Sequence, residues 1–160
     1  MRISFDLDGT LFVSNINYAG PAMLNFVQRD NVAMLRKDTR LLMTALMERG
    51  WEICFYTNSL RSRKSLIVWA VRLGISLHDV INQQVHENKC NELGVIPAQV
   101  PSKMPSWFQI DLHVDDSEII AREGQDNGFE VLLIKEDDPE WVDKVLARAD
   151  AIAAQKTTKT

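Results

Sequence analysis

Cysteine and long apolar runs are both scarce in this chain of 160 residues. Two cysteines, Cys54 and Cys90, exclude a disulfide framework, and a reducing cytoplasm fits this usage best. Cys54 lies in an apolar run, which predicts a buried thiol. The apolar runs are too short to span a bilayer, and the N-terminal residues lack the apolar stretch of a secretory signal. We therefore expect a cytoplasmic protein without a membrane partner.

Glycine and proline are also few, at 7 and 5 residues, which excludes collagen-like and low-complexity chains. No repeat of fixed period is present. With 46% hydrophobic and 25% charged residues, the composition is that of an ordinary globular protein. The net charge of −4 argues against a nucleic-acid partner bound by bulk charge, although a local basic patch stays compatible with it.

Five short apolar segments predict β-strands. Two of them, residues 51–56 and 130–134, do not alternate with polar residues, which is typical of strands buried on both faces of a parallel sheet. The predicted strands are Arg2–Leu7, Trp51–Tyr56, Asp79–Ile81, Gln109–Val114 and Glu130–Ile134.

Helical patterns separate these strands. The predicted helices are a stripe of Leu35, Leu42, Ala45 and Leu46 closed by Gly50, a helix over Ser62–Leu73 closed by Gly74, a helix over Ser117–Asn127 before Gly128, and a last stripe of Trp141, Val145, Ala149 and Ile152. Residues 82–102 have no clear period and are predicted as a short helix and a loop. The alternation predicts an α/β fold: a doubly wound, Rossmann-like parallel sheet of about five strands with helices on both faces.

Acidic and hydroxyl side chains follow three of the predicted strands. The segments are Asp6–Leu11, Thr57–Ser59 and Asp115–Ser117. Residues two apart on a strand point the same way, so Asp6 and Asp8 can share a face. Because ligands of doubly wound sheets bind at the carboxyl ends of the strands, these carboxylates would meet at one edge and repel one another. A hard divalent cation such as Mg²⁺ would resolve that repulsion.

These segments resemble three motifs of the haloacid-dehalogenase (HAD) superfamily of phosphohydrolases. Residues 6–10 (DLDGT) resemble the first motif, residues 55–59 (FYTNS) the second, and residues 113–117 (HVDDS) the double-aspartate form of the fourth. The motifs occur in the family's order, and the resemblance covers about residues 2–134. It implies a phosphatase, because Asp8 is the acid that dehalogenating members lack.

The resemblance also implies roles for the acidic residues. Asp6 would be the nucleophile that forms an aspartyl-phosphate. Asp8 would protonate the leaving oxygen and then activate the hydrolytic water. Asp6, the backbone carbonyl of Asp8, and Asp115 would bind Mg²⁺, and Asp116 would support that shell, directly or through water.

The remaining implied roles concern the phosphate. Thr57 would hydrogen-bond it, helped by the backbone amide of Asn58, while Thr10 would brace the loop that holds Asp8. The family's third motif is one lysine shortly before the fourth strand. Lys103 is our first choice for it, and Lys89 is the alternative.

Family members often insert a lid domain, and this chain has little room for one. Residues 11–34 predict a loop and flap, so we expect the capless, minimal form: a single domain over residues 1–152 and a frayed tail over 153–160. An open site needs to be covered, either by a large substrate or by a neighbouring subunit in a homo-oligomer. The expected partner is a phosphorylated substrate, either a small molecule or a macromolecule.

Simpler interpretations stay open beside this one. The acidic pairs could be turn-forming or helix-capping residues. The histidines, His78, His86 and His113, lack metal-ligand spacing and are expected to be structural or solvated. The basic cluster of Arg61, Arg63 and Lys64 at a helix start fits a solvated face slightly better than anion binding at the rim of the site. A receiver-like module that stores a phosphoryl group, and an idle scaffold of the same fold, are the alternative functions.

Overall fold

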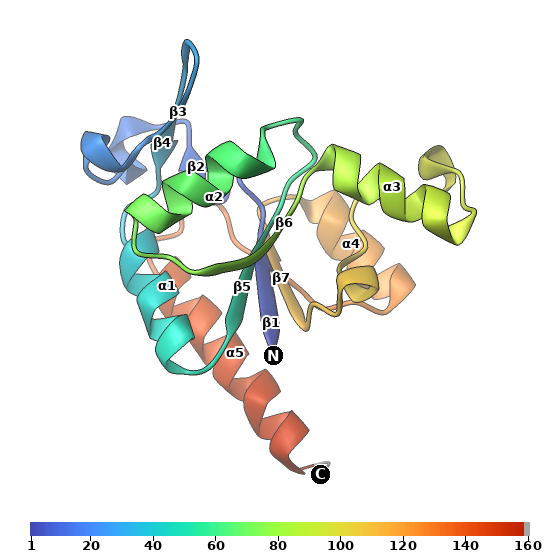
Figure 1. Cartoon of the computed structure of the whole chain (residues 1–160). Coiled ribbons are helices and arrows are strands. Elements are labelled where there is room, and N and C mark those ends of the chain that lie inside the picture. Colours follow the sequence, from blue (N-terminus) through green and yellow to red (C-terminus); the bar gives the residue numbers. More distant parts are fainter. Residues whose placement is uncertain (159–160) are drawn as a thin grey trace.

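A five-stranded parallel sheet forms the centre of the computed structural model, which describes residues 1–158. The strand order is β6-β5-β1-β7-β8, so the fold predicted from the sequence is confirmed. The strands are β1 (Arg2–Phe5), β5 (Glu52–Tyr56), β6 (Leu77–Ile81), β7 (Leu112–Asp115) and β8 (Val131–Leu133). The chain runs from β1 to β5 and β6 and then crosses back to β7 (Figure 1). The order therefore reverses between β1 and β7, where such sheets bind ligands.

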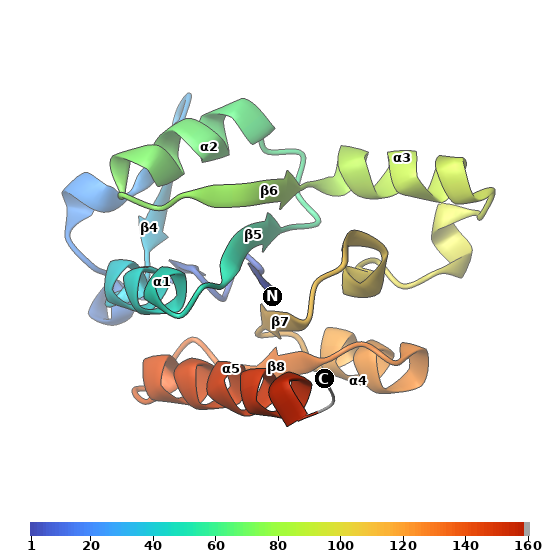
Figure 2. The ribbon, with the colours of Figure 1, turned by 60° about the horizontal axis from the view of Figure 1, so that its bottom comes forward.

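Helices cover both faces of this sheet. The helices α1 (Thr39–Glu48), α2 (Arg63–Arg72) and α5 (Trp141–Thr158) lie on one face, whereas α3 (Gln83–Leu93) and α4 (Glu118–Asn127) lie on the other (Figures 1 and 2). Ser62, Asn82 and Ser117 accept a hydrogen bond from a backbone N–H of the first turn of α2, α3 and α4. Residues 82–102, predicted as a short helix and a loop, thus contain a helix of 11 residues.

Strand β7 begins later than the sequence predicted. The 3-10 helix η4 (Pro105–Phe108) precedes it, and Gln109 adopts a left-handed conformation with φ of 56°. Because that conformation cannot continue a strand, pairing starts only at Leu112.

The segment predicted as a loop and flap contains three short strands. Strands β2 (Phe12–Val13), β3 (Phe26–Gln28) and β4 (Asn31–Leu35) pair antiparallel in the order β2-β4-β3, with the 3-10 helices η1 (Ile16–Tyr18) and η2 (Ala22–Leu24) between β2 and β3. We call residues 12–35 the flap. Leu35, predicted on a helical stripe, instead ends β4, because helix α1 starts only at Thr39.

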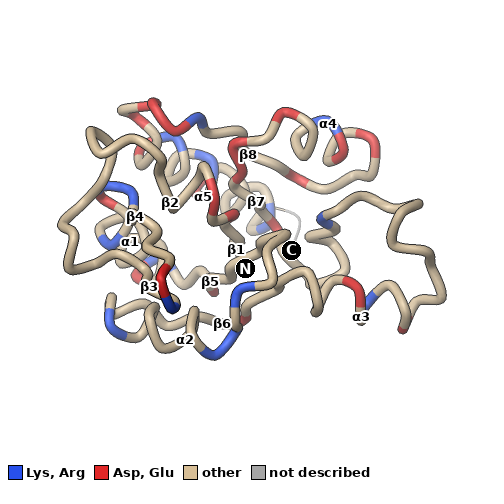
Figure 3. The backbone as a smooth tube through the Cα atoms, turned by 90° about the horizontal axis from the view of Figure 1, so that it is seen from above, with Lys and Arg blue, Asp and Glu red and all other residues tan. Residues whose placement is uncertain are grey.

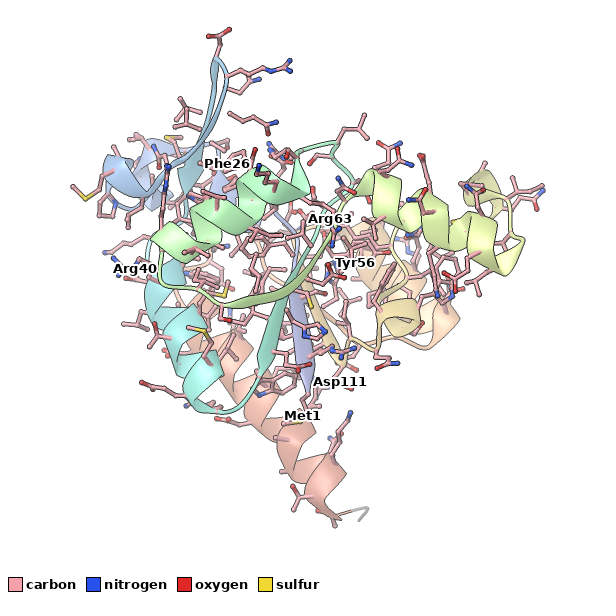
Figure 4. The ribbon with its side chains drawn as sticks, viewed as in Figure 1. Met1, Phe26, Arg40, Tyr56, Arg63 and Asp111 are labelled. Carbon is pink, nitrogen blue, oxygen red and sulfur yellow. The ribbon has the colours of Figure 1, made fainter. Side chains whose placement is uncertain are left out.

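The flap shares the main hydrophobic core. Phe26 lies against α2, where its ring packs edge-on to Trp69 at a centroid distance of 5.5 Å (Figure 4). Phe12 and Leu35 belong to the same buried cluster as Val145 of α5 and Leu42 of α1. Burial of this apolar surface therefore fixes the flap beside the carboxyl ends of the strands.

The C-terminal helix is longer than expected. Helix α5 continues to Thr158, so the frayed tail predicted over residues 153–160 is corrected for residues 153–158, and the last two residues lie outside the described part. The hydroxyls of Thr157 and Thr158 donate to the carbonyls four residues earlier, those of Ala153 and Ala154, so each hydroxyl has a partner within the helix. Within residues 1–158, no helix combines the length and apolar content needed to cross a membrane.

Candidate active site

Two carboxylates come from neighbouring strands at the reversal of strand order. Asp6 directly follows β1, and its N–H donates to the carbonyl of Val114 in β7 at 2.9 Å. Asp115 ends β7. Both residues are almost fully buried, with 7% and 1% of their surface exposed. Parallel pairing of β1 with β7 thus places two acids side by side at the edge where ligands bind.

The ammonium group of Lys103 lies between these acids. Its Nζ is 2.6 Å from Oδ1 of Asp6 and 2.6 Å from Oδ2 of Asp115. Lys103 is 2% exposed, and the neighbouring Met104 N–H donates to the hydroxyl of Tyr56, which anchors the segment. Lys89, the alternative, pairs with Glu92 on the exposed side of α3. Of the two candidate lysines, the structure therefore brings only Lys103 to the acids.

The pKa values of the two acids are shifted in opposite directions. Burial raises the pKa of Asp6 to about 7, with the nearby Asp115 adding to the effect and Lys103 opposing it. Burial also acts to raise the pKa of Asp115, but the hydrogen bonds from His113 and Lys103 and the charge of Lys103 outweigh it and hold that pKa below its ordinary range. Without a metal ion, the pocket therefore favours a state in which only one of the two carboxyl groups is ionised.

His113 connects Asp115 to the strand behind it. Its Nε2 lies 2.8 Å from Oδ2 of Asp115, and its Nδ1 lies 2.7 Å from the hydroxyl of Ser4. Burial, its largest influence, lowers the pKa of His113, so the ring is neutral. Since an ionised Asp115 can only accept, Nε2 holds the proton and Nδ1 accepts from Ser4. The structural role expected for His113 is therefore to hold Asp115 in place. The sequence spacing of two residues indicates that both side chains lie on the same face of β7.

Asp116 completes an acidic cluster. One carboxylate oxygen from each of Asp6, Asp115 and Asp116 lies within 4.8 Å of the other two, an arrangement that suits a cation. The hydroxyl of Thr10 donates to Oδ1 of Asp116 at 3.2 Å, so Thr10 braces this acid. Gly9 faces the same carboxylate at a φ of 85°, and a Cβ at this position would collide with Asp116. The close approach of Asp116 to the backbone therefore requires glycine at position 9.

Asp8 is not among the acids of this cluster. Its side chain is 57% exposed, and its two oxygens accept hydrogen bonds from the guanidinium of Arg61 at 2.5 and 2.7 Å. Asp8 thus stands at the mouth of the site rather than among the buried acids. Arg61, part of the basic cluster noted in the sequence, is the partner that the motif pattern did not predict.

The predicted phosphate-binding residues lie at the end of β5. Thr57 is buried, and its hydroxyl lies 3.2 Å from both the hydroxyl and the N–H of Ser59. The Asn58 side-chain amide donates to the hydroxyl of Ser102, one residue before Lys103. The structure therefore links the β5 loop to the lysine segment, while the Asn58 side chain lies at the exposed surface.

This arrangement fits a divalent cation and a phosphate together. Three oxygens from acids are hard ligands of the kind that Mg²⁺ prefers, and the buried pair is short of positive charge despite Lys103. A cation here would pull both carboxylates to the ionised form. The site can then present an oxygen nucleophile next to bound positive charge.

Comparison with known proteins gave matches among solved structures alone: no family model matches the chain, and no curated protein does. Similar structures include a HAD-superfamily hydrolase of subfamily IA from Geobacter sulfurreducens, with 14% identity over 82% of this chain and 88% of that one, at a TM-score of 0.47. The cobalt-bound deoxy-D-mannose-octulosonate 8-phosphate phosphatase from Haemophilus influenzae is 18% identical over 91% of this chain and 86% of that one, also at a TM-score of 0.47.

Proposed function

We propose that this protein is a Mg²⁺-dependent phosphatase that hydrolyses a phosphate monoester through an aspartyl-phosphate on Asp6. The observation that supports it most strongly is the contact of Asp6 with Lys103, within a cluster shared with Asp115 and Asp116. A buried acid at the carboxyl end of the central strand, next to a cation and further acids, is the arrangement that nucleophilic attack on phosphorus needs.

Asp6, Asp115 and Asp116 would hold the metal ion, together with the backbone carbonyl of Asp8 that the family resemblance assigns to it. When bound, the metal supplies positive charge that offsets the charge of the phosphate and of the acids. Lys103 adds a second cation to the same place, so two anions can approach each other.

The chemistry divides into two displacements. In the first, an oxygen of Asp6 bonds to phosphorus as the bond to the leaving oxygen breaks, and Asp8 gives its proton to that oxygen. In the second, Asp8 takes a proton from water as the water oxygen bonds to phosphorus, which releases phosphate and restores Asp6. Thr57 and the amide of Asn58 would hold the phosphoryl oxygens throughout, and Thr10 keeps Asp116 in place.

The test is phosphate release from a panel of phosphate esters, measured with Mg²⁺ and with chelator. We expect release with Mg²⁺, none with chelator, and a loss of at least about a thousandfold in Asp6→Asn, because the nucleophile is removed. The matched control is Asp126→Asn, at an exposed position of α4, which should keep full activity.

Release that persists in Asp6→Asn, or with chelator, would contradict the proposal. Trapping of the phosphorylated enzyme separates the remaining alternative: a phospho-aspartate that lasts minutes to hours identifies a receiver-like module. No release and no phosphoenzyme with any ester identifies an idle scaffold or a macromolecular substrate.

A further inference from the structure

A cavity of about 830 Å³ adjoins Asp8. It lies between the flap and the segment that leads into α2, and its lining includes Asp8, Phe12, Arg29 and Arg61. The volume is within the range of small-molecule sites. Since Asp8 lines the cavity and lies two residues after Asp6, a group attached to a phosphate at Asp6 can extend past Asp8 into this space.

Arg61 is held at the wall of the cavity. Its backbone carbonyl accepts from the Asn82 side chain at 3.1 Å, and its guanidinium lies over the ring of Phe12 at 5.2 Å. The side chain is 24% exposed. Arg61 thus presents its planar fork toward the cavity, with one face covered by an aromatic ring.

The fork has a single acidic partner among the described residues that line the cavity. Glu136 also lines it, but the oxygens of Glu136 accept from the backbone N–H groups of Ser14 and Asn15 and from the Ser14 hydroxyl. Asp8 alone accepts from Arg61. If Asp8 turns toward a leaving oxygen, a half-buried guanidinium is left facing the cavity without an acid.

We propose that the leaving group of the substrate has a second anionic group, a carboxylate or a phosphate, and that Arg61 binds it in this cavity in place of Asp8. The inference rests on the proposed phosphatase function and names its substrate class. A guanidinium fork matches a carboxylate or a phosphate in two parallel hydrogen bonds, as it now matches Asp8. The exchange keeps one anion on Arg61 at all times, and it frees Asp8 when a substrate of the right class is present.

Arg29 also lines the cavity, but it is exposed at the turn between β3 and β4. The other two cations of the basic cluster, Arg63 and Lys64, do not compete for this role. Arg63 donates to the carbonyl of Val80 and pairs with Asp79, which turns it to the sheet edge (Figure 4). Lys64 is exposed on α2, one of the positive residues along that helix (Figure 3). Neither residue lines the cavity. Lys64 therefore serves as a matched control that removes one positive charge near the site without touching the fork.

The test is binding, measured by calorimetry with Mg²⁺ in an Asp6→Asn background so that turnover does not interfere. The reference probe is glycerol 3-phosphate, in which the group attached to the phosphate is uncharged. The two anionic probes are 3-phosphoglycerate, which adds a carboxylate, and propane-1,3-diol bisphosphate, which adds a second phosphate. We expect one or both anionic probes to bind at least about tenfold more tightly than the reference, the gain typical of charged hydrogen bonds. Arg61→Gln should abolish that gain, whereas Lys64→Gln should keep it.

Equal affinity for the three probes, a gain that survives Arg61→Gln, or an absence of binding by all three would overturn the proposal. The anionic probe that gains identifies which group the substrate has. Because this readout is binding, its failure is separate from a failure of the phosphate-release assay, which decides the proposed function by itself.

Discussion

The ammonium nitrogen of Lys103 lies 2.6 Å from Oδ1 of Asp6, although 97 residues separate them in the chain. The pair is buried, and a second carboxylate, Asp115, lies equally close to the same nitrogen. One positive charge is therefore paired with two carboxyl groups in a buried environment, where water does not screen their repulsion. That shortage of positive charge has consequences that can be measured.

Substitution of Lys103 should reveal the repulsion between the acids. In Lys103→Met, Asp6 and Asp115 would face each other without a cation, so we expect the free energy of unfolding in chelator to fall by about 3 kcal/mol. Mg²⁺ should restore part of it by replacing the lost charge. Urea denaturation with and without Mg²⁺ measures both effects. The control is Lys89→Met, whose exposed pair with Glu92 should contribute less than about 1 kcal/mol, and equal losses in the two variants would contradict the prediction.

Asp6 should also make stability depend on pH. Burial raises its pKa from 3.8 to about 7, so between these values the folded state binds a proton that the unfolded state has released. Its contribution is thus complete below pH 4 and is lost as the pH rises through 7, by up to about 1.4 kcal/mol per pH unit. The opposite contribution of Asp115, whose pKa is lowered, disappears only below pH 4.

The difference in unfolding free energy between the native protein and Asp6→Asn, measured in chelator from pH 4.5 to 7.5, isolates this effect. We expect it to fall steadily as the pH rises. A flat difference would show that Asp6 titrates normally in the folded protein. By the same linkage, Mg²⁺ should bind more weakly below pH 7, because the ion competes with the proton on Asp6.

The sheet and its edge could be predicted because they depend on local patterns. Apolar runs ending in Asp6 and Asp115 locate two strands, and the parallel pairing that joins those residues follows from the alternation of strands and helices. The capping residues Ser62 and Ser117 mark the helix starts directly. Local chemistry therefore accounts for most of the central fold.

The rest depends on tertiary contacts that no short segment encodes. The flap strands are short, and β3 is stabilised by packing of Phe26 on Trp69, 43 residues away. The pairing of Arg61 with Asp8 joins two loops. In the sequence alone, the basic cluster that contains Arg61 fits a solvated helix start slightly better than a role at the site. The requirement for glycine at position 9 is similar, because the close approach of Asp116 appears only in the folded chain.

A comparison of Gly9 with Gly74 distinguishes the effect of backbone strain from the effect of a collision at the site. Gly9 and Gly74 have φ of 85° and 76°, so Gly→Ala at either should cost about 1 kcal/mol for a strained backbone. A Cβ at Gly74 meets nothing within 4 Å, while one at Gly9 strikes the carboxylate of Asp116. We expect Gly9→Ala alone to lose most phosphate release and to weaken Mg²⁺ binding. Thermal unfolding and metal titration of the two variants check this, and indistinguishable variants would show that Asp116 moves aside freely.

Arg36, which directly follows the flap, should hold the flap in place beside the site. Its buried guanidinium stacks on the ring of Trp141 at 4.4 Å and donates to four carbonyl oxygens, those of Thr10, Lys135, Glu136 and Asp138.

A lysine keeps the charge at position 36 but cannot reproduce that fork or the stacking, so Arg36→Lys should lower the unfolding free energy by about 2–3 kcal/mol. Arg40→Lys replaces an arginine whose Nε makes a single hydrogen bond, to the carbonyl of Leu73, and should cost less than about 1 kcal/mol. Because the Arg36 fork joins the Thr10 loop to the segment after β8, we also expect Arg36→Lys to reduce phosphate release at temperatures where the protein stays folded. Full activity under those conditions would limit Arg36 to a role in stability.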